Sequence, residues 1–230
     1  MSPLKPSLAA LSMLLAVTAC QKASEPAAPS DTQAQESAAA QSQGAPVEAT
    51  AASTEVDPEV AKRKAAMEFA LAEQKIAEDP QGQWAASAKA SSTYASGADE
   101  TAGYSAWQAT GAPNVTAYSD SSESWASKES DKGIEWLEVG FAKPVHATEL
   151  RIRQTNAPGA IIKVELIDDK GGKHSVFSGV DETTYPPQTI TWFNAKTEKT
   201  DYLVKGAVIT LATNAVGGWN EIDAVQLIGE

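Results

Sequence analysis

Cysteine and histidine are nearly absent from this sequence, which has one cysteine and two histidines among its 230 residues. A single cysteine excludes a disulfide framework within the chain. His146 and His174 have no cysteine or second histidine beside them, and the chain has neither a Gly-x-Ser-x-Gly elbow nor a glycine-rich phosphate loop. Glu135 and Glu138 are three residues apart on one predicted strand, so their side chains face opposite sides and cannot form an acid/base pair. We therefore expect a protein that is not an enzyme.

Basic residues are also scarce: 18 Lys and Arg stand against 30 Asp and Glu, a net charge of −12. Nucleic-acid phosphates require clustered Lys and Arg, so the sequence argues against a nucleic-acid partner. The same deficit argues against a polybasic contact with anionic lipid. An acidic surface is compatible with neutral polymers or divalent cations, although it often serves only solubility.

The one long apolar run lies at the N-terminus, where residues 8–17 follow Lys5 and lead into small residues that end at Cys20. This order predicts a secretory signal peptide over 1–19, too short and wrongly flanked to span a membrane. The segment resembles a bacterial lipobox, which implies cleavage before Cys20 and a lipid anchor, such as palmitate, on that residue. Because Gln21 is not aspartate, the resemblance also implies the outer membrane, with a periplasmic or surface-exposed domain. The alternative is a chance cysteine in an ordinary cleaved signal.

A polar, low-complexity segment follows the signal. Residues 20–54 are rich in Ala, Ser, Gln, Pro, Glu and Thr and show no apolar period. Such a segment cannot bury enough apolar surface to offset the loss of backbone entropy on folding, so we expect a disordered tether.

A helix is predicted over 55–80. Asp57 is a good N-cap, Pro58 suits the first helical position, and Asp79-Pro80 ends the helix. Its apolar residues form two narrow stripes, one of Val56, Val60, Met67 and Leu71, the other, nearly opposite, of Ala61, Ala65, Phe69, Ala72 and Ile76. Two narrow stripes indicate a semi-rigid stalk or a helix packed loosely on the domain. A coiled coil or a partner-binding helix is the alternative.

Short alternating strands separated by turns begin near Trp84, and all six tryptophans lie from there onward. With one or two strands before residue 110, the count reaches about eight; the others are predicted at 134–141, 148–154, 161–167, 175–179, 188–193, 204–211 and 220–228. No helices are interleaved. The sequence therefore predicts an all-β domain over 84–230, an eight-stranded antiparallel jelly-roll sandwich preceded by the signal peptide, the tether and the helix. Four tryptophans are expected in its core: Trp107, Trp125, Trp136 and Trp192.

The chain ends on an apolar strand that follows Gly217-Gly218 and Trp219. A terminal strand of this kind is expected to close the sheet, since free ends otherwise fray. Simple alternation places Asp223 on the same face as Val225 and Leu227, toward the core. A carboxylate there would need hydrogen-bonding partners.

Several runs of residues together resemble the galactose-binding-like β-sandwiches, which include discoidin-type carbohydrate-binding modules. They are YSAWQATGAPN at 104–114, SWAS at 124–127, EWLEV at 135–139, NAPGAI at 156–161 and WNEIDAV at 219–225. The resemblance covers about residues 84–230 and implies an eight-stranded jelly roll, in agreement with the strand count. Members of this superfamily bind sugars, lipids or proteins, so the fold alone does not specify a ligand.

The resemblance also implies a structural Ca²⁺ between an early loop and the last strand. The matching positions are Asn114 and Asp120 in the loop 112–124 and Glu221 in the last strand. Asn114 departs from the family pattern, in which an acidic residue is common. Loop carbonyls and carboxylates suit this hard cation, whereas the alternative is that these are plain turn residues.

Sugar binders present exposed aromatic rings beside a few fixed polar groups. Tyr118 and Trp219 are the preferred ligand-binding aromatics, with Asn220, Asn156 and Arg153 as hydrogen bonders. Further aromatic candidates are Tyr94, Tyr104, Tyr185 and Trp107. The expected function is a lipid-anchored, non-catalytic binding module of the bacterial cell envelope that recognises a glycan or related polymer. The alternative is a protein-interaction or assembly subunit that uses the sandwich rim or the helix.

Overall fold

The computed structural model describes residues 57–95 and 99–230. The predicted signal peptide 1–19, the lipidation site Cys20 and the tether 20–54 lie outside the described residues. Among those that are described, no helix is both long and apolar enough to cross a membrane.

The first element is α1, Pro58–Ala77. Asp57 caps it, its side chain accepting a hydrogen bond from the backbone N–H of Glu59 at 2.8 Å, and Pro58 occupies the first turn, where its missing N–H costs nothing. After the helix, the chain turns at 78–81 and enters the first strand. The predicted start and stop signals therefore lie at the two ends of the observed helix.

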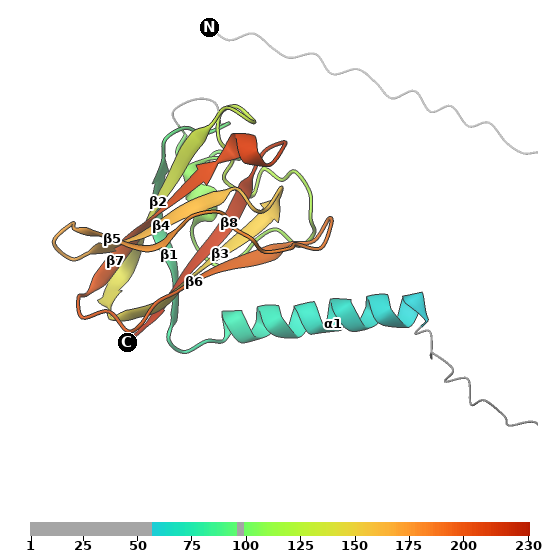
Figure 1. Cartoon of the computed structure of the whole chain (residues 1–230), viewed down its shortest axis with the longest axis horizontal. Helices are drawn as coiled ribbons and strands as arrows, with labels where there is room; N and C mark the ends of the chain where they lie inside the picture. The colour runs from blue at the N-terminus through green and yellow to red at the C-terminus, as the bar shows by residue number, and fades with distance from the viewer. Residues whose placement is uncertain (1–56, 96–98) are drawn as a thin grey trace, which may run out of the picture. The chain divides into compact units, whose positions relative to one another are not determined.

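Eight antiparallel strands form the rest of the described chain, as the sequence predicted (Figure 1). Their bounds are β1 Gly82–Ala90, β2 Ile134–Val145, β3 Ala147–Asn156, β4 Ile161–Asp168, β5 Lys173–Ser178, β6 Thr191–Lys196, β7 Val204–Ala212 and β8 Glu221–Gly229. Two short 3-10 helices lie in the loops, η1 at Ala106–Ala109 and η2 at Thr213–Ala215. The strand order is β5-β4-β7-β2-β1-β8-β3-β6.

Strand β1 joins the two layers of the sandwich. Its first residues, Gly82 to Trp84, pair with β8, while its later residues, from Ala85 to Ala90, pair with β2. The register with β2 shifts between Ala85 and Ser87, and such a bulge lets one strand bend from one sheet into the other. The last strand, β8, lies between β1 and β3, so the C-terminal strand closes the sheet as predicted.

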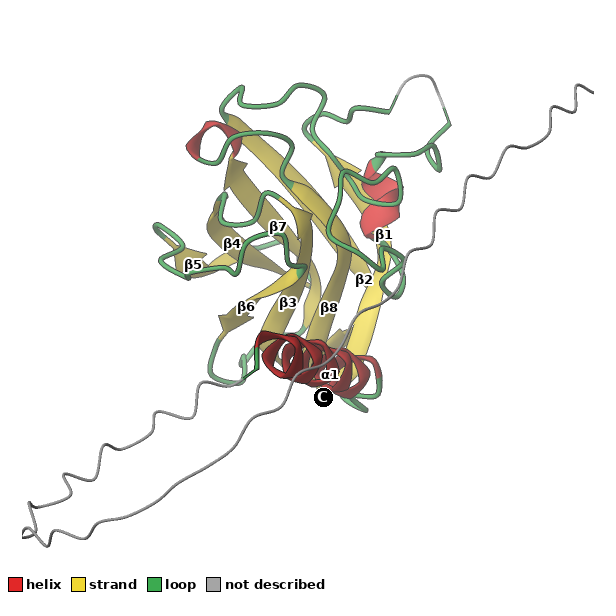
Figure 2. Ribbon diagram, turned by 90° about the vertical axis from the view of Figure 1, so that its right-hand side faces the viewer, coloured by secondary structure: helices red, strands yellow, loops and turns green. Residues whose placement is uncertain are grey.

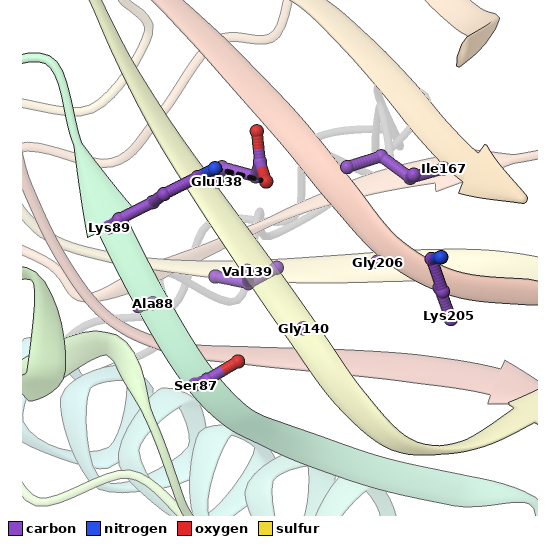
Figure 3. A pocket seen from close by; sticks show the side chains of 9 residues that line it. All are labelled: Ser87, Ala88, Lys89, Glu138, Val139, Gly140, Ile167, Lys205 and Gly206. Carbon is purple, nitrogen blue, oxygen red and sulfur yellow. Dashed lines mark ion pairs between the residues drawn. The ribbon is translucent and has the colours of Figure 1, made fainter. Parts of the chain in front are cut away.

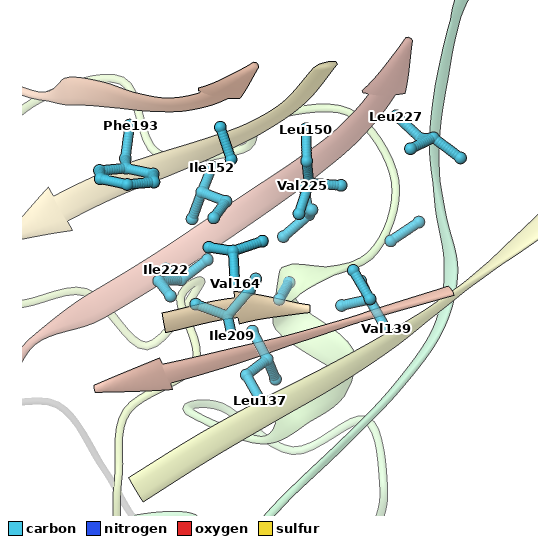
Figure 4. Packing of buried hydrophobic residues seen from close by; sticks show 14 of the residues in the cluster. Leu137, Val139, Leu150, Ile152, Val164, Phe193, Ile209, Ile222, Val225 and Leu227 are labelled. Carbon is cyan, nitrogen blue, oxygen red and sulfur yellow. The ribbon is translucent and has the colours of Figure 1, made fainter. Parts of the chain in front are cut away.

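The core lies between the layers and is made of the inward residues of both. Figure 4 shows side chains from β3, β6 and β8 facing those of β2, β4 and β7. The fully buried side chains of the core include those of Leu137, Ile152, Val164, Ile209 and Leu227. Burial of one such side chain contributes roughly 1.5–3 kcal/mol, so this alternating set is what specifies the strand faces.

Asp223 does not face the core, and the prediction for this residue is wrong. Arg153 pairs with Ala224 and Gln154 with Ile222, which leaves Asp223 as the extra residue of a β-bulge. Ile222 and Val225 both point into the core cluster, and Asp223 points to the outer face, where it meets Arg153. Alternation fails here because the bulge resets the side-chain period.

Of the four tryptophans predicted in the core, only one lies there. Trp125 is fully buried in the core, as expected. Trp107, on η1, is 47% exposed, so its expected core position is wrong. Trp136 and Trp192 are half-buried on the outer faces of their sheets, where the ring of Trp192 lies 6.4 Å from that of Trp84. A large aromatic ring on an outer face needs a cover, and for Trp192 part of that cover is α1.

The helix docks on the sandwich through its C-terminal half. Glu73 binds the guanidinium of Arg153 at 2.9 Å and accepts a hydrogen bond from the indole N–H of Trp192. The backbone carbonyl of Ile76 accepts from the side chain of Gln226 at 2.9 Å. Of the two predicted stripes, one has Phe69 and Ile76 half-buried and its alanines exposed, while the large residues of the other stay exposed.

Candidate functional site

Loops gather at one end of the sandwich, and we call this end the rim (Figure 2). It is formed by the described loop segments 91–95, 99–133, 157–160, 179–190 and 213–220. The other end carries the turn 78–81, the segment 197–203 and the C-terminus, since His146 and Glu230 exchange backbone hydrogen bonds there. Because neighbouring strands are antiparallel, loops far apart in the sequence meet at the rim.

An aromatic cluster of Tyr94, Tyr104 and Trp219 lies at the rim. Tyr94 is the central ring: its centroid is 5.1 Å from that of Tyr104 and 5.4 Å from that of Trp219, at interplanar angles of 75° and 78°. With Asp120 and Ala126, the three rings line a cavity of about 50 Å³. The indole N–H of Trp219 donates to the carbonyl of Ser127 at 3.1 Å, which fixes the ring.

A pair of carboxyl groups lies beside this aromatic cluster. Asp120 Oδ1 accepts from the Tyr104 hydroxyl at 2.7 Å, and this hydrogen bond raises the pKa of Tyr104 to about 12. Glu221 accepts from the backbone N–H of Ser121 at 3.1 Å through Oε2, whereas its buried Oε1 has no hydrogen-bond partner within the described residues. Glu221 is 1% exposed. Burial, and then the nearby Asp120, raise the pKa of Glu221 to about 8.

These two carboxyl groups fit a cation only in part. Ca²⁺ takes six to eight oxygens, and Glu221 Oε1 is a buried oxygen that lacks a partner. Within 57–95 and 99–230, no three His, Cys, Asp or Glu side chains gather closely enough to hold a metal ion. Asn114, the third predicted ligand, binds elsewhere, since its backbone N–H donates to Asp223 at 3.2 Å. Asp120 and Glu221 are brought together as predicted; Asn114 shares none of their contacts.

Two of the predicted ligand residues, Tyr118 and Asn220, organise the turn at Ala157 instead of forming the aromatic cluster. The Tyr118 hydroxyl accepts from the Ala157 N–H at 3.2 Å, and the Asn220 amide donates to the Ala157 carbonyl at 2.7 Å. Asn156 pairs with Glu221 across β3 and β8. Ala157 has a φ of 41°, a left-handed conformation that a non-glycine residue needs support to hold. Tyr118 and Asn220 supply that support.

Arg153, the fifth predicted ligand residue, is buried below the rim. It is 3% exposed, and its Nη1 donates to Asp223 at 2.9 Å and to the Val115 carbonyl at 2.8 Å. Asp223 also accepts from the backbone N–H groups of Asn114 and Val115. Burial raises the pKa of Asp223, against which the Arg153 guanidinium is the main opposing influence. The structure assigns this pair to joining β3, β8 and the 112–116 loop.

Sequence reasoning ranked Tyr94 and Tyr104 below Tyr118, and it gave Glu73 no role. The unusual feature of Tyr104 is its positive φ of 61°, which is visible in the backbone of the structure but not in the sequence. Trp219 was placed correctly at the rim, but its partner rings come from a loop more than a hundred residues earlier. The pairing of Trp125 with Ile222 in a short bridge, together with the hydrogen bond from Ser121 to Glu221, holds that loop on the start of β8 and brings the two together.

A larger groove of about 380 Å³ lies away from the rim, on the outer face of β1, β2 and β7 (Figure 3). Its floor is formed by Gly140 and Gly206. Lys89 and Glu138 at its edge pair with each other at 2.9 Å, and Lys205 donates to the carbonyl of Asp169. The charged side chains of this groove are thus engaged with the protein, and its lining contains no aromatic ring.

A sequence profile of the family described as pappalysin-1, SD scarf domain, C-terminal, matches residues 74–230. A search of curated proteins found no significant match. Similar solved structures include a chitosan-binding module of a chitosanase/glucanase from Paenibacillus sp. IK-5 (15% identity, 62% of this chain and 94% of that one, TM-score 0.43). Another is the F5/8 type C domain of a Bacteroides fragilis protein (13% identity, 66% and 98% coverage, TM-score 0.46).

Proposed function

The chain belongs to the family of the C-terminal SD scarf domain of pappalysin-1, and from this premise we propose that it is a non-catalytic binding module, lipid-anchored in the bacterial cell envelope, whose rim recognises a glycan or related polymer. The observation that carries the proposal is the aromatic cluster of Tyr94, Tyr104 and Trp219 around a cavity that Asp120 also lines. Exposed rings beside a few fixed polar groups are the usual means of holding a sugar.

The direction of the chain supports an outward-facing rim. The turn 78–81 joins α1 to β1 at the end of the sandwich opposite the rim, because Gly82 pairs with Ile228 near the C-terminus. An anchor at Cys20 would therefore connect to the end that lies away from the ligand. A Cys20→Ser variant is expected to lose palmitate labelling and to leave the membrane fraction. Retention of the label would exclude this residue as the anchor.

A glycan array tests the ligand class, and calorimetric titration of any hit tests the site. Trp219→Ala should weaken binding on the order of tenfold, since aromatic contacts in such sites each contribute about 1 kcal/mol or more. Trp107→Ala is the matched control: this ring is also exposed, but it lines a different hollow with Lys89 and Ala106. Equal losses in both variants, or no hit among envelope and host glycans, would contradict the proposal.

We propose Ca²⁺ as a structural ligand of the rim, with Asp120 and Glu221 as its carboxylate donors. The buried, unpaired Glu221 Oε1 supports it. When bound, Ca²⁺ would supply the positive charge that lets Glu221 ionise. Saturating Ca²⁺ should then raise the melting temperature relative to EDTA, by an amount equivalent to about 2.7 kcal/mol at a hundred times the Kd. Glu221→Gln should abolish the shift; an unchanged melting temperature in the wild type would exclude the metal.

A protein-interaction or assembly role is the second candidate, and α1 carries the observation that favours it. Val60, Met67 and Leu71 form one stripe that faces away from the sandwich, and Met67 and Leu71 are 67% and 62% exposed. Met67→Asp should disrupt an assembly that uses this stripe and leave the monomer folded. Because Phe69 faces the sandwich, Phe69→Asp would test docking of the helix rather than partner binding. Unchanged mass by light scattering and unchanged co-purification in Met67→Asp would exclude the helix as an interface.

A further inference from the structure

We propose that the cavity among Tyr94, Tyr104 and Trp219 receives a protonated primary amine, carried by an amino-sugar unit of the glycan, with Asp120 as its counter-ion. The proposal deepens the proposed function and rests on it, since the glycan presents the amine. The new element is the positive charge of the ligand, which does not follow from the aromatic cluster alone.

The three rings do not lie in one plane, so they do not form a single flat stacking surface. Tyr94 meets both of its neighbours edge to face, at 75° and 78°, so the three rings present surfaces in different directions around one space. A flat sugar face stacks best on a single ring plane. Ring faces that surround a point instead concentrate negative quadrupole potential there, and a cation within about 6 Å of each centroid gains most from it.

The size of the cavity suits a small polar head. A space of about 50 Å³ exceeds the roughly 10–15 Å³ that one water requires, and it accommodates a few waters or an ammonium group with its carbon. It does not accommodate a whole pyranose ring. The ring that carries the amine would lie outside, against the exposed part of Tyr94, which is half exposed.

The charge around the cavity is negative. Asp120 lines it directly and supplies this charge, whereas the buried Glu221 beside it, with its pKa raised to about 8, is mostly protonated at neutral pH. An ammonium group carries three donors and no acceptor, so Asp120 can accept from it while the rings contact its other side. The net charge of −12 favours the approach of a cationic polymer over an anionic one.

The cavity is held in place before any ligand arrives. Tyr104 has a φ of 61°, which costs free energy in a bulky residue and persists only where its surroundings impose it. Its N–H donates to the Ser122 carbonyl at 2.9 Å, its carbonyl accepts from Thr93 at 2.6 Å, and its hydroxyl donates to Asp120 at 2.7 Å. A preformed cavity avoids the entropic cost of ordering three side chains on binding.

Calorimetric titration of the soluble domain, with α1 retained, with glucosamine oligomers and with N-acetylglucosamine oligomers of equal length tests the proposal. EDTA is present, because calcium would compete for the same carboxylate. The wild type should bind the amino oligomer about tenfold more tightly, because acetylation removes the charge. Asp120→Asn should erase this preference. Asp201→Asn, an exposed carboxylate at the opposite end of the sandwich, should keep it.

Near-ultraviolet circular dichroism checks that each variant keeps its packed aromatic residues. Tyr94→Leu is a second variant that retains the carboxylate, and it should reduce affinity for the amino oligomer several-fold. Equal affinity of the wild type for both oligomers, or a preference that survives Asp120→Asn, would overturn this inference and leave the glycan proposal standing. Absence of binding to either oligomer and to every glycan on the array would overturn both.

Discussion

The carboxylate of Glu73 lies 2.9 Å from the guanidinium of Arg153, and this ion pair joins α1 to the sandwich. Arg153 in turn lies 2.9 Å from the fully buried Asp223, whose other contacts are the backbone N–H groups of the 112–116 loop. The helix, two strands and the loop behind the rim are therefore connected through one arginine. Charged groups at this depth are stable only when they are paired.

Removal of Glu73 should loosen the helix without unfolding the sandwich. Glu73→Ala is expected to lower the free energy of unfolding by about 1–2 kcal/mol, because Arg153 and the Trp192 indole both lose an acceptor. Urea denaturation followed by tryptophan fluorescence measures the loss. Glu68→Ala is the control on the same helix, where an exposed pair with Lys64 at 3.8 Å should contribute less than about 0.5 kcal/mol. Similar losses in the two variants would show that α1 does not depend on this contact.

Truncation of Asp223 should be far more damaging. Asp223→Ala leaves Arg153 buried with only the partly exposed Glu73 as its carboxylate, and the expected loss is about 3–5 kcal/mol. Replacement of both partners, Asp223→Leu with Arg153→Met, should cost less than the sum of the single changes, since neither buried charge is then left without the other and the unpaired Glu73 is partly exposed to water. Thermal unfolding of all three variants measures the coupling; additive losses would contradict a direct pair.

Stability should depend on pH through Glu221. Its pKa is about 8 in the folded protein and near the ordinary 4.5 in the unfolded chain, so the folded state binds the extra proton between these values. The free energy of unfolding therefore falls as pH rises from about 4.5 to about 8, by at most about 1.4 kcal/mol per pH unit. Urea denaturation in EDTA across this window should show the decline, and Glu221→Gln should flatten it. Glu123→Gln, exposed in the neighbouring loop, is the control and should leave the slope unchanged.

The contact of β7 with β2 should tolerate no side chain at Gly206. A Cβ built there would lie 2.7 Å from the backbone carbonyl oxygen of Val139, which cannot move without breaking the pairing of the two strands. Gly206→Ala is expected to cost about 1–3 kcal/mol by overpacking. Gly217→Ala is the matched control, since a Cβ at that position meets nothing within 4 Å. Equal melting temperatures for the two variants would contradict the observed spacing of the strands.

Much of the strand pattern was predictable, since the buried apolar residues of β2, β3 and β6 alternate with polar or less buried ones. The prediction failed where the pattern is interrupted. The bulge at Asp223 turns a residue that alternation placed inward onto the outer face. Trp107 looked like a core residue by its size, but it lies on a short helix in a loop, and no sheet covers it.

The candidate site was predicted in part for a related reason. Trp219 was singled out because turn residues surround it, and Asp120 and Glu221 because the family resemblance implies a metal there; the structure places Asp120 beside Trp219 and Glu221 near Asp120. Tyr118, Asn220 and Asn156 lie at the rim, where the side chains of Tyr118 and Asn220 hold the turn at Ala157 and the backbone of Asn156 pairs with that of Glu221. The direction in which a loop side chain points depends on backbone angles such as the φ of Tyr104. These angles leave no periodic pattern in the sequence.

The sequence by itself determined the fold class of this protein, the bounds of seven of its eight strands to within a few residues, and the presence of a capped helix before them. Periodicity and capping are local, and local patterns can be read along the chain. Only the tertiary structure decided that Glu73 meets Arg153, that Asp223 faces outward, and that Tyr94, Tyr104 and Trp219 surround one cavity. Each of these depends on contacts between residues far apart in the chain, and their geometry is fixed when the two layers pack together.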